Sequence, residues 1–135
     1  MDRATVFAGF SFVIGILCGS WFVPAIRAQY QTTKTTELMR TDLGSWCEGK
    51  EVTIQVLEAG PGSSGKHYHP AHSFGWIIEG SEIQIVQGRP AATHTVGDVN
   101  HEEPMQVSET QNAAPVKKLQ FRIVEKGKPA TTRVQ

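Results

Sequence analysis

The sequence predicts an all-β domain, a small barrel or sandwich of short strands, preceded by an apolar N-terminal segment. The chain has 135 residues, the length of one domain. Its 13 glycines and seven prolines indicate frequent turns. Between these turns, runs of alternating polar and apolar residues recur, and no amphipathic helical period interrupts them.

The N-terminal segment, residues 4–26, is apolar and carries no charge before Arg27. A short polar start, an apolar middle and a small residue such as Ala28 before the cleavage point are typical of a secretory signal. The same segment is long enough to span a hydrocarbon core of about 30 Å as a helix. Residues 1–28 are therefore predicted to form an apolar leader helix that is either a cleaved signal peptide or a membrane anchor through residues 4–26. In both cases we expect an exported domain, in the periplasm or elsewhere outside the cytoplasm.

The polar residues 29–44 are interpreted as a linker or an edge segment, and residues 45–135 as the barrel domain. Residues 51–57 alternate β-branched with other side chains, which predicts a strand, and the glycines and proline of residues 60–65 end it. Eight short strands at this spacing predict a sandwich or a barrel. The strands after the first are expected at residues 67–69, 74–79, 82–86, 93–96, 99–102, 105–110 and 118–125.

The charges of the chain point away from nucleic acid as a partner. The 13 basic and 13 acidic residues cancel, whereas nucleic-acid binding needs a clustered basic face. The cysteines, Cys18 in the leader and Cys47 in the domain, are not expected to form a disulfide with each other.

His67 and His69 are the first candidates for a metal site. They lie two residues apart on one predicted strand, so their side chains point to the same face. Neutral imidazole suits zinc, iron, nickel and copper. The alternative interpretation is a chance pair of histidines that interact through water.

The stretch that contains these histidines resembles the first motif of the cupin superfamily, which reads Gly, five residues, His-x-His, three or four residues, Glu, six residues, Gly. His67, His69 and Gly80 fall in register, Gly62 is one residue short of the expected spacing, and Ser73 stands at the glutamate position.

The second cupin motif reads Gly, five residues, Pro-x-Gly, two residues, His, three residues, Asn. Gly97 and Asn112 fit it without a gap, but Glu103, Met105 and Ser108 stand at the proline, glycine and histidine positions. The resemblance covers about residues 40–132 and implies a small cupin-type jelly-roll barrel, similar to small exported bacterial cupins.

A typical cupin metal has three histidines and one glutamate, so the resemblance carries over only two ligands, His67 and His69. Serine is a weak neutral ligand, and the loss of two ligands lowers metal affinity. His72, in the turn before Ser73, is either an exposed loop histidine or a tentative third ligand, and His101 is another candidate if its strand turns it inward. The implied cofactor is a divalent transition metal such as Zn, Fe, Mn or Ni.

The interior of such a barrel can also hold a small polar or aromatic ligand. Glu102 and Glu103 are adjacent on a predicted strand, so they point to opposite faces and form no catalytic carboxylate pair. The sequence shows no nucleophile elbow and no phosphate-binding glycine loop before a helix. The candidate pocket residues are Tyr68, Ser73, Trp76, His101 and Ser108.

Three functions remain open at this point. The first is a cell-envelope cupin-domain protein that binds a small ligand in the barrel and has a degenerate metal site. The alternative is a metal-dependent cupin enzyme, of the dioxygenase or isomerase type, that uses His67, His69 and a substitute third ligand. The third is an interaction module that forms a homodimer through an exposed edge strand.

Overall fold

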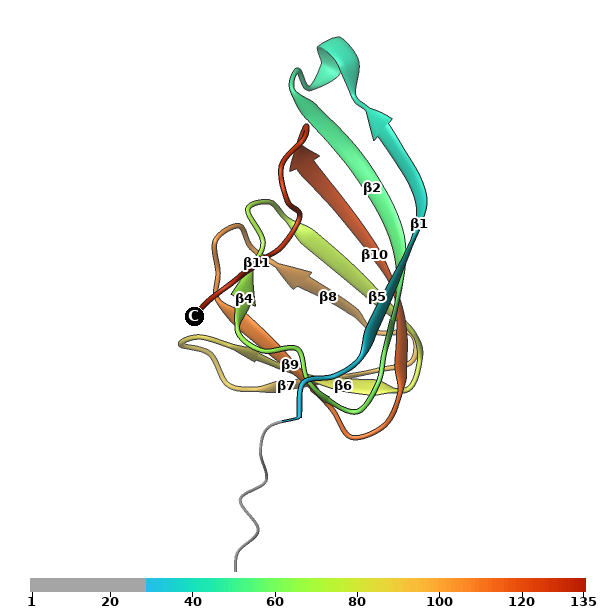
Figure 1. Cartoon of the computed structure of the whole chain (residues 1–135), viewed down its shortest axis with the longest axis vertical. Coiled ribbons are helices and arrows are strands. Elements are labelled where there is room, and N and C mark those ends of the chain that lie inside the picture. Colours follow the sequence, from blue (N-terminus) through green and yellow to red (C-terminus); the bar gives the residue numbers. More distant parts are fainter. Residues whose placement is uncertain (1–28) are drawn as a thin grey trace, which may run out of the picture.

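The computed structural model describes residues 29–135, which form two antiparallel β-sheets that face each other as a barrel (Figure 1). The only helical element among them is a short 3-10 turn, η1 (Gly44–Trp46). The all-β fold predicted from the sequence is therefore confirmed. The predicted leader lies outside the described residues. Within residues 29–135, no helix is long and apolar enough to cross a membrane.

The first sheet has five strands in the order β1-β2-β10-β5-β8, so its neighbours come from distant parts of the chain. All its strand pairs are antiparallel. The strands are β1 (Thr33–Asp42), β2 (Lys50–Ala59), β10 (Val116–Glu125), β5 (Ser73–Glu79) and β8 (Val99–Glu102).

The second sheet has the order β11-β4-β9-β6-β7, with β3 also paired to β9. Its strands are shorter, and β4 is held between β9 and β11. The strands are β3 (Gly62–Ser63), β4 (His67–Tyr68), β6 (Ser81–Val86), β7 (Ala92–Thr95), β9 (Ser108–Asn112) and β11 (Thr132–Arg133).

Most strands lie where the alternation predicts them, but the short strands β3 and β11 lie in segments where no strand was expected, and β9 begins later than expected. Within residues 29–44, β1 forms an edge strand that is exposed along its whole length. The strand expected at 105–110 begins only at Ser108, because the preceding residues form a turn. Met105, at the motif's glycine position, has a φ of 62° there, a conformation that glycine adopts more readily. Its N–H donates to the carbonyl oxygen of His69 at 2.7 Å, which ties the turn to the end of β4.

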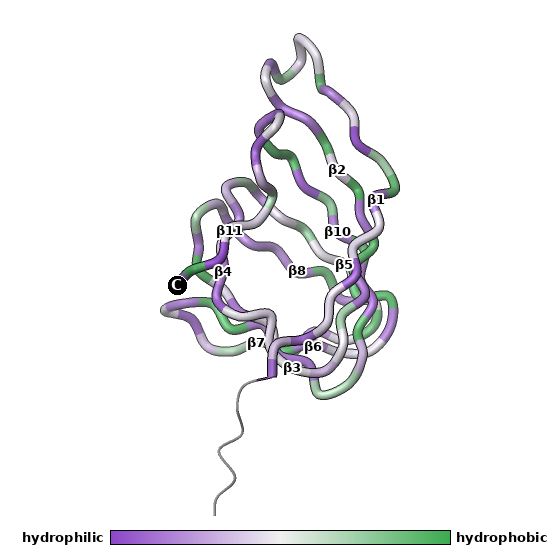
Figure 2. Tube along the Cα trace, viewed as in Figure 1, coloured by the Kyte–Doolittle hydropathy of each residue, from purple (hydrophilic) through white to green (hydrophobic). Residues whose placement is uncertain are grey.

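The first sheet has a polar inner face and an apolar outer face. Along β10, Lys118 and Arg122 are buried and line the interior, whereas the residues between them, such as Phe121 and Ile123, lie on the outer face. Figure 2 shows this alternation of hydrophilic and hydrophobic residues along β2 and β10. In this sheet it is therefore the polar residues of the alternation, such as Lys118 and Arg122, that face the barrel interior and are buried.

A buried ion pair connects the two sheets through the interior. Lys118 Nζ of β10 donates to both carboxylate oxygens of Glu82 of β6, at 2.9 and 2.7 Å. Asn100 Nδ2 of β8 donates to the same carboxylate at 2.8 Å. Buried charges are tolerated in a low-dielectric interior only when they are paired and hydrogen-bonded, and Lys118 and Glu82 meet both conditions.

Candidate metal and ligand site

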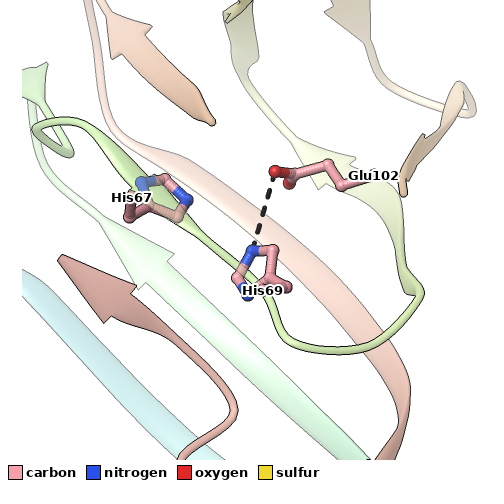
Figure 3. A group of neighbouring side chains, drawn as sticks. All are labelled: His67, His69 and Glu102. Carbon is pink, nitrogen blue, oxygen red and sulfur yellow. Dashed lines mark ion pairs between the residues drawn. The ribbon is translucent and has the colours of Figure 1, made fainter. Parts of the chain in front are cut away.

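His67, His69 and Glu102 converge inside the barrel (Figure 3). His67 belongs to β4, His69 follows it directly, and Glu102 is the last residue of β8 in the opposite sheet. One ligand atom of each residue lies within 4.8 Å of the others. His69 and Glu102 are 2% and 4% exposed. The group therefore brings two imidazoles and one carboxylate together, and two of its three members, His69 and Glu102, are shielded from bulk water.

The backbone orients both imidazoles with the same ring nitrogen inward. His67 Nδ1 lies 2.9 Å from the carbonyl oxygen of Gly65, and His69 Nδ1 lies 2.8 Å from that of Ala130. A carbonyl oxygen only accepts, so in each ring Nδ1 carries the proton and, in the neutral ring, Nε2 has a free lone pair. Such outer hydrogen bonds are typical of metal-binding histidines. Burial lowers the pKa of His67, which favours the neutral form that binds a metal.

Glu102 is held as a carboxylate. Ser108 Oγ donates a short hydrogen bond to its Oε2. Burial opposes ionisation, but proximity to His69, the Ser108 hydroxyl and the charge of His67 outweigh burial and lower the pKa of Glu102 to about 2. His69 Nε2 lies 3.6 Å from Glu102 Oε2, which is longer than a hydrogen bond, so we attribute the effect of His69 to its proximity.

The donor set fits a divalent transition metal. Nitrogen and carboxylate ligands lie about 2.0–2.2 Å from zinc, so two ligands at a tetrahedral angle are about 3.4 Å apart. The 3.6 Å between His69 Nε2 and Glu102 Oε2 matches this separation. Two histidines and one carboxylate also form the set that binds non-haem iron with open positions for substrate.

The two serines at the motif's ligand positions hold other functional side chains. Ser108, at the histidine position, binds the carboxylate of Glu102. Ser73, at the glutamate position, accepts a hydrogen bond of 3.0 Å from Arg122 Nε. Because Ser73 pairs with Glu102 in the register of β5 and β8, the carboxylate is brought to the inner face beside the position that the motif gives to glutamate.

The structure separates the other predicted site residues from this group. His72 and His101 lie on the outside, where His72 Nδ1 and His101 Nε2 are 2.9 Å apart, and both rings stack with Phe74. Trp76 is 51% exposed on the same outer face. Tyr68 lies between the two candidate ligands His67 and His69, so it points to the opposite face of β4.

Glu102 is the functional residue that the sequence reasoning missed. His101 and Glu102 are neighbours on one strand, so one of them must face the interior. The pairing of Phe74 with His101 and of Ser73 with Glu102 decides the question, because paired residues share a face.

The group opens into a cavity of about 410 Å³ in the barrel interior. This volume lies in the range of small-molecule sites. Most of the lining residues are polar, and they include Gln55, His67, His69, Glu102, Gln120 and Arg122.

Comparison with known proteins places this architecture in the cupin fold. The DMSP lyase DddQ from Ruegeria pomeroyi DSS-3 is similar, with a TM-score of 0.62 and 16% identity, over 76% of this chain and 51% of that one. The chain thus spans about half the length of that protein. A cupin superfamily protein from Desulfitobacterium hafniense DCB-2 is similar with a TM-score of 0.58 and 14% identity, over 74% of this chain and 84% of that one.

The Clostridium difficile EutQ protein is similar with a TM-score of 0.55 and 10% identity, over 68% of each chain. No protein-family model matches the chain, and no curated protein matches its sequence. At these identities the similarity concerns the fold alone, and the fold is that of the cupin superfamily, as the two sequence motifs imply.

Proposed function

We propose that this protein is an extracytoplasmic cupin-fold protein that binds a small molecule in the barrel interior, beside a divalent transition metal held by His67, His69 and Glu102. The observation that carries the proposal is the convergence of two imidazoles and one carboxylate in a cavity of about 410 Å³. His69 and the half-buried His67 contribute pre-oriented rings, and Ser108 holds the carboxylate in place.

The metal would act as a Lewis acid toward an oxygen or nitrogen atom of the ligand. Zn, Fe, Mn and Ni all accept this donor set. The protein's own part is to keep the site polar, preformed and separated from bulk water. The C-terminal segment contributes to this separation, because the carbonyl oxygen of Ala130 lies 2.8 Å from His69 Nδ1 and the hydroxyl of Thr131 lies 3.2 Å from it.

A second candidate is a metal-dependent enzyme of the dioxygenase or isomerase type. The observation that favours it is the donor set, since two histidines and one carboxylate leave coordination positions open for substrate or oxygen. In this candidate Glu102, rather than His72, is the substitute third ligand. Stoichiometric iron together with substrate-dependent oxygen uptake would favour the enzyme over the binding protein.

The location and the assembly of the protein are part of the proposal. The apolar residues 4–26 support export, with the leader either cleaved or kept as an anchor. Cell fractionation and the N-terminal sequence of the mature protein test both points. The exposed edge strand β1 is consistent with a homodimer, and light scattering on the purified protein tests it.

Metal analysis of single variants tests the site. We expect one equivalent of transition metal in the full-length protein purified in mild detergent, and its loss in His69→Ala and Glu102→Gln. His72→Ala is the matched control, because His72 lies on the outer face with His101, and it should retain the metal. Retention in Glu102→Gln with loss in His72→Ala would contradict the proposed ligand set.

A further inference from the structure

Arg122 places a buried positive charge at the cavity without an anionic partner among residues 29–135. The residue is 5% exposed and lines the cavity. Its Nε donates to Ser73 Oγ at 3.0 Å and its Nη1 donates to Gln55 Oε1 at 3.2 Å. Both acceptors are neutral, and Nη2 donates to none of the described residues.

The three buried carboxylates of residues 29–135, Glu51, Glu82 and Glu102, are engaged with other groups, and Glu51 pairs with Arg40. Glu82 forms its ion pair with Lys118, and Glu102 is held by Ser108 and faces His69. Burial lowers the pKa of Arg122, and the charge of Glu102 opposes that effect. A guanidinium nevertheless stays protonated in proteins. Its burial without a direct ion pair is therefore unfavourable unless a further anion reaches it.

Charge balance in the interior strengthens this requirement. Lys118 and Glu82 offset each other, as do Arg122 and Glu102 at longer range. A divalent ion on His67, His69 and Glu102 would add two positive charges to this balanced interior. An anionic ligand would offset part of that excess, whereas a neutral ligand would not.

We propose that the ligand of this cavity is a small organic acid whose carboxylate is bound by Arg122. The inference rests on the proposed function, because it assigns the chemical class of the molecule that the same cavity holds. A planar guanidinium presents paired N–H donors that match the two oxygens of a carboxylate. A monoanion suits the site better than phosphate does, because the nearby Glu102 repels a dianion more strongly.

Binding of propionate, compared with its neutral isostere propionamide, tests this inference. Both are titrated into the full-length protein by calorimetry, once after metal removal with EDTA and once after loading with zinc. We expect the protein to bind propionate and not propionamide in both forms, and more tightly with zinc. A charge-assisted hydrogen bond corresponds to about tenfold or more in affinity, so Arg122→Gln should weaken propionate binding by at least that factor.

Two further variants control for charge and geometry. Arg122→Lys keeps the charge but loses the paired donors, so it should bind propionate with intermediate affinity. Arg89→Gln removes an exposed arginine that pairs with Glu103 away from the cavity, and it should bind propionate like the unmodified protein.

The outcomes separate this inference from the proposed metal site. Propionate binding that is unchanged in Arg122→Gln would overturn the inference, and so would equal binding of propionate and propionamide, no binding of propionate in either form, or tighter binding of phosphate. If zinc does not bind but propionate still depends on Arg122, the metal site is refuted and the inference holds. If Arg122→Gln does not fold, the comparison of propionate with propionamide and the Arg122→Lys variant decide the question.

Discussion

Acidification of the metal-free protein should remove a defined amount of stability that depends on Glu102. The pKa of this carboxyl falls from its ordinary value of 4.5 to about 2 in the folded protein. A carboxyl whose pKa is lowered by folding stabilises the fold above its unfolded pKa, and this contribution disappears as the pH falls toward the folded pKa. A difference of about 2.5 in pKa corresponds to about 3 kcal/mol.

The assay compares urea unfolding of the EDTA-treated protein with that of Glu102→Gln between pH 6 and pH 2. Other carboxyls with lowered pKa values, such as Asp42 and Asp98, titrate equally in both proteins, so the difference between the two curves isolates Glu102. We expect this difference to shrink by about 3 kcal/mol between about pH 5 and pH 2. Parallel curves across this range would refute the placement of Glu102 as a buried carboxylate beside His67 and His69.

Three further predictions concern single side chains. Lys118→Met leaves Glu82 as a buried unpaired charge and should lower the free energy of unfolding, measured with urea, by about 3–5 kcal/mol. The control variant Lys117→Met breaks an exposed pair and should change this free energy by about 1 kcal/mol or less. Equal effects of the two substitutions would contradict the buried pair. Ser108→Ala removes the hydrogen bond that orients Glu102 and should weaken zinc binding by roughly 10- to 100-fold in a chelator competition, and an unchanged affinity would show that the serine does not support the site. Met105→Gly should raise the free energy of unfolding by about 1 kcal/mol, because Met105 has a positive φ and an exposed side chain. The control Gln106→Gly, in the same turn, should lower this free energy. A loss of stability in Met105→Gly would contradict the claim that the backbone is strained at Met105.

Local features of the sequence were sufficient for the strands and for the first two members of the site. Period-two alternation marked most of the strands, since a strand exposes successive side chains on opposite faces. The two-residue spacing of His67 and His69 placed both rings on one face for the same reason. The motif spacing around them also identified the cupin fold, although the glutamate and the third histidine were absent.

The local sequence pattern does not determine which face of each strand points into the barrel. Alternation separates Phe121 and Ile123 from Lys118 and Arg122, but it does not say which set lines the barrel. In this protein Lys118 and Arg122 line the barrel, because Lys118 forms an ion pair with Glu82 across the interior and Arg122 donates a hydrogen bond to Ser73. The expectation that Trp76 lines the pocket was wrong, because Trp76 lies on the exposed outer face of β5 whereas Ser73 of the same strand faces inward.

The sequence by itself determined an all-β chain, the common face of two histidines and the loss of two motif ligands. Only the tertiary structure decided that Glu102 lies beside the position of the missing carboxylate, that the motif serines bind Glu102 and Arg122, and that His72 and His101 lie outside. The physical reason is that alternation relates neighbours within one strand. The register between β5 and β8, which are separated in the chain by residues 80–98, determines which side chains share the interior.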